Sequence, residues 1–529
     1  MKRWHLSVGL LSLAIIAGIW VIFSPEPVEG IKEIKVGSSN EEPVARIFGD
    51  GLQFVEKEQT EGQWATAHDN VYSYKAYDGN SYVGRVSLTE RRLQNGDTIY
   101  YSSFVNEGND SHNVTFTYPA MQAEMTSFAS AGETIEHKHD NTVGVDPTTI
   151  PVGYATLKDG GSAWLGQRYE SSVLRKEYSG DQSSILRDFQ NESNPYATKE
   201  NQLEQTLVAK EDSVAESWFM RSEEELFSSS KKATSWAEDM AENYRWAKKW
   251  LTPDGVYQKI PWSIEPGTKM GYGRVIGALP HQDALSRFEQ TGERYFESMS
   301  LNAVTTIEAY RSNQDTELWK TEYTSTWVQK AYGIHAPYTD TRHNEKLSLF
   351  LMNASEVLGL ESIGAESLKY ADYLVAQSND GNIISFGDDA FLVGDYDGPG
   401  KEEVPHASLN HALGESYYLL KAYDKSGDEK YLELAYSIRK AIETIGSQWI
   451  REEGDHSEDL WYQVNEDHTF EGNDYQLLTL VDLHKNQKLW AETKYGESDT
   501  FDTLIESKTS YLERTGLDVE QAVNERISP

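Results

Sequence analysis

The pattern of apolar and polar positions divides the chain into three parts. Residues 6–23 form an almost unbroken apolar run, residues 46–228 contain short segments rich in Val, Thr, Tyr and Phe, and most of the remainder repeats at helical spacing. Two-residue alternation is typical of half-buried strands, whereas three- and four-residue steps are typical of amphipathic helices. We therefore expect a multidomain β plus α protein, in which a β-sandwich-like domain precedes helical hairpins.

The β-rich part carries a hairpin signal. Residues 82–93 and 98–105 flank an Asn-Gly-Asp turn at residues 95–97, and another strand-like segment covers residues 113–118. Asn-Gly between two such segments is a strong short-range indication of a β-hairpin. Several strands at this spacing predict a β-sandwich over residues 46–228.

The period becomes helical after the serines at residues 228–230. One expected helix has the face Trp236, Met240, Tyr244, Ala247 and Leu251 and ends at Leu251, before a turn at residues 253–255. Two later segments, 284–296 and 414–432, each read as two helices joined at a glycine turn.

Alternating short and long turns in paired helices predict an α/α toroid over residues 229–495, followed by a helical tail at 496–529. The active cleft of a closed toroid lies on one rim. An open helical-repeat scaffold that binds proteins is the alternative.

The N-terminus predicts a membrane anchor. Lys2 and Arg3 precede the apolar run, which is close to the roughly 20 residues that span a bilayer. The two cations favour a cytoplasmic N-terminus, and no small-x-small cleavage site is evident. We expect an uncleaved single-pass anchor at residues 1–23, a tether at 24–45, and an extracytoplasmic body at the cell membrane.

Composition further narrows the possible classes of function. The net charge of −37, from 85 acidic and 48 basic residues, argues against a nucleic-acid partner, because a phosphate backbone requires a concentrated cationic face. The chain has no cysteine, which excludes disulfides and thiolate chemistry. Its 529 residues favour at least two domains.

The most informative motifs lie within residues 404–483. In order they are Leu409-Asn410, Tyr423-Asp424, Ser426-Gly427, Trp461-Tyr462 and Asp474-Tyr475. Together with Gln282 and the Thr-Gly-Glu turn at 291–293, they resemble the C-terminal helical domain of the D-glucuronyl C5-epimerase family. More broadly, the chain resembles α/α-toroid carbohydrate-active enzymes. It departs from the family pattern by a long segment at residues 321–397.

The resemblance implies a uronate-containing polysaccharide as substrate and removal and return of a proton at C5. Such chemistry needs acid/base groups on both faces of the sugar ring and a stabilised carboxylate. By resemblance, Tyr462 and Tyr475 are the catalytic candidates. A tyrosine serves as a base only if nearby charge lowers its pKa.

Several residues near these motifs are further candidates. Glu415 shares a helical face with His411 and is a third catalytic candidate, while Asn410 in the first turn and His411 next to it are expected to bind the substrate. The alternative is that Ser408 caps the helix and Glu415 is a solvated surface acid. A metal site of His406, His411 and Glu415 matches no strong signature, so no metal or cofactor is expected.

Other loops contribute candidates for substrate binding. Arg274, in a Gly-Tyr-Gly-Arg segment, is expected to hold a uronate carboxylate, and Tyr272 of that segment and the later Gln282 are further substrate-binding candidates. Trp461 offers a flat face for a sugar ring, although packing explains most tryptophans equally well.

Two other function classes remain open. A glycosidase or lyase on the same toroid would use a pair of carboxylates from Asp283, Asp340 and Asp388 or its neighbour Asp389. A non-catalytic glycan-binding or scaffold protein would present a smooth concave face instead. An enzyme should bring Tyr462, Tyr475, Glu415 and an arginine together in one cleft.

Overall fold

The structure of the chain is a computed structural model. It describes residues 30–37, 43–119, 121, 123–127, 135–136, 145–146, 153–158, 160–199, 202–246, 249–275, 282–314, 316–452 and 454–527. The anchor predicted at residues 1–23 lies outside these ranges, as does much of the tether predicted at 24–45. Within them, no helix is both long and apolar enough to cross a membrane.

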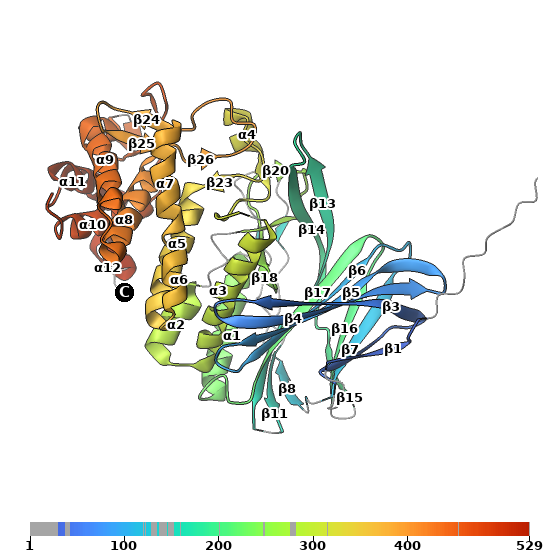
Figure 1. The fold of residues 1–529 in the computed structure, drawn as a ribbon. Helices are drawn as coiled ribbons and strands as arrows, with labels where there is room; N and C mark the ends of the chain where they lie inside the picture. Colours follow the sequence, from blue (N-terminus) through green and yellow to red (C-terminus); the bar gives the residue numbers. More distant parts are fainter. Residues whose placement is uncertain are drawn as a thin grey trace, which may run out of the picture.

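Antiparallel sheets dominate the N-terminal half of the molecule (Figure 1). The smaller sheet has the order β1 (Glu33–Val36), β2 (Ala45–Phe48), β7 (His112–Tyr118), β16 (Gln202–Ala209) and β15 (Tyr196–Lys199). The main path of the larger sheet is β18 (Lys249–Thr252), β19 (Gly255–Lys259), β21 (Gly271–Arg274), β14 (Ser183–Ser193), β13 (Arg168–Glu177), β17 (Ser213–Ser222), β6 (Thr98–Asn106), β5 (Ser81–Leu93), β4 (Ala67–Asp78) and β3 (Leu52–Gln63). Strands β8 (Ala123–Ser127), β11 (Gly153–Leu157) and β12 (Ser162–Leu165) attach to it, and β9 (Ile135–Glu136) pairs with β10 (Val145–Asp146).

The predicted hairpin is confirmed as β5 and β6. The backbone N–H of Leu93 donates to the carbonyl of Asp97 at 2.8 Å, and Gly96 supplies the positive φ that the turn requires. Residues 113–118 form most of β7, which belongs to the smaller sheet rather than continuing this hairpin. Both sheets contribute to one buried apolar cluster. The sandwich arrangement itself stays a prediction.

The helix predicted to end at Leu251 is shorter than expected. Helix α1 covers Ser230–Trp246, and residues 249–252 form β18, which pairs with β19. Trp250 stacks between Tyr169 and Tyr257, with ring centroids 5.0 and 5.1 Å away. Tertiary packing against the sheet therefore overrides the helical period, and the prediction for Leu251 is wrong. The domain boundary at residue 228 stays a prediction, and three strands beyond it join the larger sheet.

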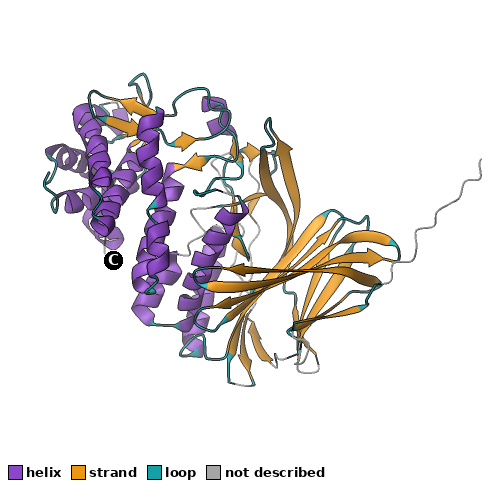
Figure 2. Ribbon diagram, viewed as in Figure 1, coloured by secondary structure: helices purple, strands orange, loops and turns teal. Residues whose placement is uncertain are grey.

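Helices dominate the C-terminal half (Figure 2). They are α2 (Gln282–Thr291), α3 (Arg294–Asn313), α4 (Thr326–Tyr332), α5 (Thr341–Val357), α6 (Glu361–Glu366), α7 (Lys369–Asp380), α8 (Leu409–Ser426), α9 (Glu429–Ile445), α10 (Leu478–Trp490), α11 (Asp499–Arg514) and α12 (Val519–Ile527). The two predicted hairpins are confirmed as α2–α3 and α8–α9, and their turns place Gly292 and Gly427 at positive φ. The β plus α class is thus confirmed, whereas closure into a toroid stays a prediction.

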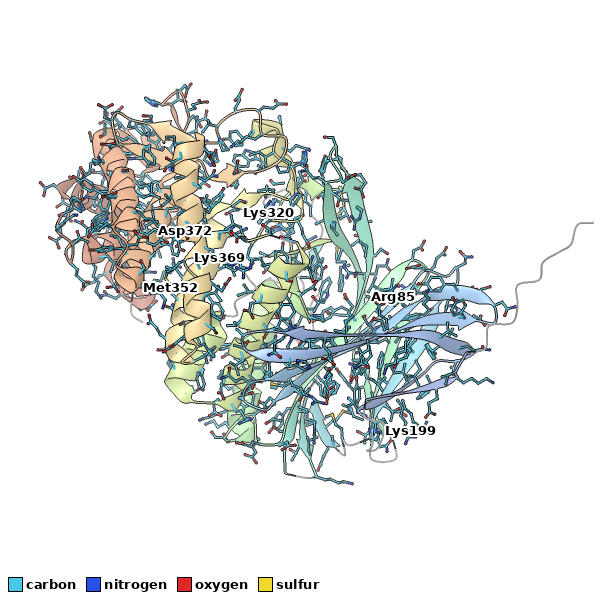
Figure 3. The ribbon with its side chains drawn as sticks, viewed as in Figure 1. Arg85, Lys199, Lys320, Met352, Lys369 and Asp372 are labelled. Atoms are coloured by element: carbon cyan, nitrogen blue, oxygen red, sulfur yellow. The ribbon has the colours of Figure 1, made fainter. Side chains whose placement is uncertain are left out.

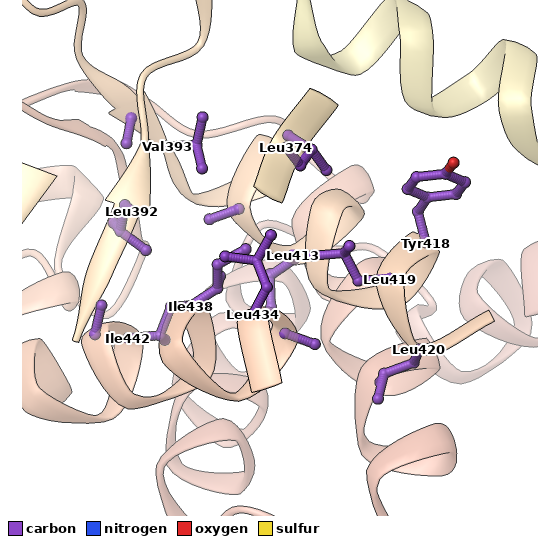
Figure 4. Close-up of a cluster of buried hydrophobic side chains, with 14 of the residues drawn as sticks. Leu374, Leu392, Val393, Leu413, Tyr418, Leu419, Leu420, Leu434, Ile438 and Ile442 are labelled. Atoms are coloured by element: carbon purple, nitrogen blue, oxygen red, sulfur yellow. The ribbon is translucent and has the colours of Figure 1, made fainter. Parts of the chain in front are cut away.

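Apolar packing holds the helices together and joins them to the sheet. Figure 4 shows one buried cluster that includes Leu413 and Leu419 of α8, Ile438 of α9 and Leu392 of β25 (Phe391–Val393). A second cluster combines Trp164 and Trp218 of the larger sheet with aromatic and aliphatic residues of α2, α3 and α5. Side chains fill the region between the two halves (Figure 3).

A buried cation also links the two halves. The guanidinium of Arg91 on β5 donates to both carboxylate oxygens of Asp69, at 2.9 and 2.8 Å. It also donates to Asn302 and Thr306 of α3, at 2.9 and 3.1 Å. Because a buried charge must be paired and hydrogen-bonded, this network fixes α3 against the sheet.

Short strands at one end of the helices complete the architecture (Figure 2). The pairs are β20 (Ile264–Glu265) with β22 (Thr324–Ser325), β23 (Thr339–Asp340) with β26 (Tyr396–Asp397), and β24 (Ile383–Ser385) with β25. A three-stranded sheet has the order β27 (Ala407–Ser408), β28 (Trp461–Val464) and β29 (Phe470–Asn473). These strands carry the loops that form the candidate site.

Candidate active site

A cleft of about 460 Å³ opens at the end of the helices where the short strands lie. Its lining residues are Trp262, Ser263, Tyr323, Ser325, Thr326, Trp327, Val328, Tyr338, Asp340, Arg342, His343, Lys346, Tyr396, Asn410, His411, Tyr462, Tyr475 and Leu478. The first turns of α5, α8 and α10 all border it, so the positive ends of three helix dipoles face one space. Such an arrangement favours an anionic ligand.

Aromatic side chains form an exposed rim around the cleft. Trp262, Trp327 and Tyr475 are 41%, 49% and 51% exposed, and they are three of the seven large hydrophobic side chains that are exposed in the described part of the chain. Leaving flat aromatic faces in water is costly unless a ligand covers them. The rim is therefore suited to stacking on the apolar faces of sugar rings.

A buried aspartate organises two histidines at one wall. Asp395 is fully buried and lies 3.1 Å from Nε2 of His406 and 3.5 Å from Nδ1 of His411. It also accepts hydrogen bonds from the backbone N–H of Ser408, at 2.9 Å, and from the Ser408 hydroxyl. Burial alone would raise the pKa of Asp395, but His411, His406 and Ser408 outweigh it and hold that pKa below its usual value.

His411 is the member of this cluster that reaches the cleft. Its Nδ1 shares a 2.8 Å hydrogen bond with the hydroxyl of Thr341, while Asp395 lies behind it. Burial lowers the pKa of His411 below 6.5, although Asp395 opposes the shift. The imidazole is therefore neutral at neutral pH, and the carboxylate behind it would stabilise the imidazolium formed on accepting a proton.

A second carboxylate and imidazole lie at the start of α5. Asp340 caps this helix by accepting a hydrogen bond from the backbone N–H of His343 at 3.0 Å. Nδ1 of His343 lies 3.7 Å from the other carboxylate oxygen, and burial lowers the pKa of this histidine as well. Asp340 is the one carboxylate among the residues that line the cleft.

Two cations, Arg342 and Lys346, lie one turn apart on the same helix and both line the cleft. Arg342 forms ion pairs with Glu345 at 3.0 Å and Asp482 at 2.8 Å, and it donates to the carbonyl of Asn410 at 2.9 Å. Lys346 has no ion pair among the described residues. Burial and the neighbouring Arg342 lower its pKa. The pair could thus receive a ligand carboxylate.

The two candidate tyrosines meet beside the Asp395 cluster, where the ring of Tyr462 lies 5.9 Å from that of His406. The rings of Tyr462 on β28 and Tyr475, which follows β29, are 5.7 Å apart and nearly perpendicular. Partial burial is the main reason that the pKa of each tyrosine lies above 10, and Asp395 raises both further. The expected lowering by nearby charge is not found. Both phenols remain protonated at neutral pH, which suits a proton donor rather than a base.

Asn410 and Glu415 occupy different depths of α8. Asn410 lines the cleft, and its side-chain oxygen is buried without a hydrogen-bond partner among the described groups. Glu415 is 1% exposed and does not line the cleft. Burial, with help from Asp395, raises its pKa well above 4.5, so the surface-acid interpretation of Glu415 is wrong.

The remaining sequence candidates lie away from the cleft lining. Arg274 is committed to ion pairs with Asp254 at 2.7 Å and with Glu322, and Tyr272 is buried in the adjacent aromatic cluster. The ring of Trp461 packs under the guanidinium of Arg451 at 4.4 Å. Each is thus used in packing or ion pairing within the protein.

Two alternative acids are exposed and also lie outside the cleft lining. Asp283 is at the start of α2, and Asp388 lies in the loop between β24 and β25, next to Asp389. Gln282 is the first residue of α2. The pair of cleft carboxylates that a glycosidase would need is therefore not formed by Asp283, Asp340 and Asp388.

Sequence reasoning missed Arg342, Lys346 and Asp395. The long segment 321–397, which departs from the family pattern, supplies much of the lining and all three of these residues. Arg342 lies within the Tyr-Thr-Asp-Thr-Arg-His segment at 338–343, and Asp395 begins an Asp-Tyr-Asp-Gly segment. The concentration of polar and aromatic residues in these two short loops was the available signal.

Comparison with known proteins places these features in context. No protein-family model matches the chain, and no curated protein sequence matches it. Among solved structures it is similar to a D-mannose isomerase and to the cellobiose 2-epimerase of Bacillus thermoamylovorans. Each is 14% identical, with TM-scores of 0.37 and 0.38, and each match covers 54% of this chain and 70% of the other.

A third similar structure is a family 76 α-mannanase of Bacteroides thetaiotaomicron, at 11% identity and a TM-score of 0.34. The match covers 47% of this chain and 63% of the mannanase. The three named proteins act on carbohydrates. Scores this low do not establish a shared fold or reaction.

Proposed function

We propose that this protein is a carbohydrate-active enzyme that epimerises a uronate within a polysaccharide, by removing and returning the proton at C5. The observation that carries the proposal is the meeting of a neutral imidazole, two protonated phenols and a cation pair in one cleft. Proton transfer at a carbon next to a carboxylate requires a base, an acid and charge stabilisation of this kind.

The exposed aromatic rim favours a saccharide as the substrate, because Trp262, Trp327 and Tyr475 present rings to the cleft. Arg342 and Lys346 support an acidic sugar, since they add positive charge beside three helix N-termini. The protein as a whole carries a net charge of −37, so this local cationic patch would select where an anionic polymer binds.

In the proposed reaction, His411 accepts the C5 proton, and the electron pair left on carbon delocalises into the substrate carboxylate. Arg342 and Lys346 stabilise the resulting enediolate, while Asp395 stabilises the imidazolium of His411. A phenol of the Tyr462–Tyr475 pair delivers a proton to the opposite face of C5, which inverts the centre. Water then reprotonates the phenolate and removes the extra proton from His411.

A lyase is the second candidate, because it uses the same first step. If the C4–O bond to the neighbouring sugar breaks after C5 loses its proton, and a phenol protonates the departing oxygen, the product is an unsaturated uronate rather than an epimer. The cleft supports this alternative through the same base and cations. A two-carboxylate glycosidase has less support, since Asp340 is the one acidic residue in the lining.

The cellular setting is part of the proposal. The apolar run at residues 6–23, preceded by Lys2 and Arg3, supports a single-pass anchor with the folded body outside the cytoplasm. An extracytoplasmic position would give the cleft access to polysaccharides at the cell surface.

The experiment is incubation of the protein with a panel of uronate-containing and neutral polysaccharides in deuterated water. NMR should show deuterium at C5 of a uronate polymer, with no exchange in neutral polymers. An ultraviolet-absorbing unsaturated product would assign a lyase, and new saturated reducing ends would assign a glycosidase. Absence of any reaction and of any binding across the panel would refute a carbohydrate-active enzyme.

A further inference from the structure

A fully buried lysine connects the C-terminal tail to the two segments that carry the cleft tyrosines. Lys508 of α11 is 0% exposed, and its ammonium lies 2.5 Å from Asp459 and 2.8 Å from Asp474. Both carboxylates are themselves at most 3% exposed. A buried ammonium persists only when it is paired in this way.

The two aspartates stand beside the tyrosines in the chain. Asp459 lies three residues before Tyr462, and its carboxylate accepts a hydrogen bond from the backbone N–H of Leu460 at 2.8 Å. Asp474 directly precedes Tyr475, and it accepts from the hydroxyl of Thr479 on α10 at 2.5 Å. Burial raises the pKa of Asp474 to about 6, while Lys508 opposes that shift.

One face of α11 contacts the loop before β28 at several further points. The hydroxyl of Ser507 donates to the carbonyl of Glu458 at 2.8 Å, and Arg514 forms an ion pair with the Glu458 side chain. The hydroxyl of Tyr511 lies 3.3 Å from Nδ1 of His456. Residues three and four apart share a helix face, so these contacts form one continuous interface.

From this geometry we infer that Lys508 is a positioning residue for the cleft. By pairing with Asp459 and Asp474 from the C-terminal tail, it holds Tyr462 and Tyr475 at their separation. The helical tail then contributes to the geometry of the site. The consequence for turnover rests on the proposed function, whereas the consequence for tyrosine position does not.

The test uses the full chain labelled with fluorotyrosine, with the fluorine NMR signals of Tyr82, Tyr462 and Tyr475 assigned from the three Tyr→Phe variants. In Lys508→Met both signals should shift or broaden, and the signal of Tyr82 on the distant sheet should not. The matched control is Lys494→Met, which removes a surface lysine that pairs with Glu429 at 3.2 Å. It should leave all three signals in place.

Turnover provides a second readout. Misplacing a reacting group costs up to about 10²-fold in rate, so kcat of Lys508→Met should fall by that order while KM changes less. Lys508→Arg keeps the charge and should recover part of the lost rate. If no uronate polymer reacts with any variant, the proposed function fails, and the fluorine signals still decide the positioning claim.

Lys508→Met leaves two buried carboxylates without their cation, so a second variant is needed. The triple change of Asp459→Asn, Asp474→Asn and Lys508→Met removes all three charges and should fold, with both tyrosine signals displaced. Unchanged Tyr462 and Tyr475 signals in either folded variant would overturn the inference. So would a triple variant that does not fold, because Lys508 would then serve the fold rather than the site.

Discussion

Gly414 on α8 offers a way to move Arg342 without removing any residue of the cleft. A methyl group at this position would lie 1.9 Å from Nη1 of Arg342 and 2.5 Å from Oε2 of Glu345. Such distances are far below van der Waals contact, so the guanidinium must leave its place. Gly414→Ala should therefore break the 2.9 Å hydrogen bond from Arg342 to the carbonyl of Asn410.

The expected effect on stability follows from two opposing contributions. Losing a buried hydrogen bond from a charged group costs about 1.5–3 kcal/mol, while replacing Gly by Ala inside a helix returns about 1 kcal/mol. The free energy of unfolding of Gly414→Ala should thus fall by about 0.5–2 kcal/mol. Displacement of Arg342 should also weaken binding of a uronate polymer by about tenfold, or roughly 1.4 kcal/mol.

Urea unfolding followed by circular dichroism measures the first effect, and KM for the reactive polymer measures the second. The control is Gly267→Ala, because a methyl group there meets no atom within 4 Å. A Gly414→Ala variant with the KM and the urea midpoint of the control would refute the role given to Arg342.

Three further predictions concern charge and the aromatic rim. The free energy of unfolding of the natural protein should fall relative to that of Glu415→Gln as pH rises above 4.5, because a carboxyl whose pKa is raised in the folded state costs about 1.4 kcal/mol of stability per pH unit between its unfolded and folded pKa values. Equal stability at all pH values would contradict a buried, protonated Glu415. Lys346→Met should weaken binding of uronate polymers by about tenfold and leave neutral glycans unaffected, as measured by calorimetry. Trp262→Ala should lower affinity for the polymer with a change in unfolding free energy within about 0.5 kcal/mol, and unchanged affinity would exclude stacking on this ring.

Local patterns were sufficient where neighbouring residues decide the structure. The Asn-Gly turn of β5 and β6 and the glycine turns at Gly292 and Gly427 depend on backbone conformations that few residues adopt, so the sequence exposes them directly. The prediction of a helix through Leu251 was wrong because the same apolar residues also fit a strand that packs against large aromatic side chains. Packing across the sheet, which local reasoning does not contain, decided that segment.

The sequence also predicted part of the cleft lining. Tyr462, Tyr475, Asn410, His411 and Asp340 all line it, as residues at the starts of helices and the ends of strands tend to do. Arg274 matched the required chemistry equally well in sequence, but it lies outside the cleft lining, where it pairs with Asp254 and Glu322. The elevated pKa values of the tyrosines also arise from burial, which only the folded structure defines.

The most direct test of the central claim is the rate of deuterium incorporation at C5 of a uronate polymer in Tyr462→Phe and Tyr475→Phe. The exposed Tyr82 on the distant sheet provides the control, Tyr82→Phe. We predict exchange and inversion at C5 in the natural protein and the control, and a fall in net inversion of about 10²-fold or more in both cleft variants. Inversion at the natural rate in both cleft variants would contradict the account.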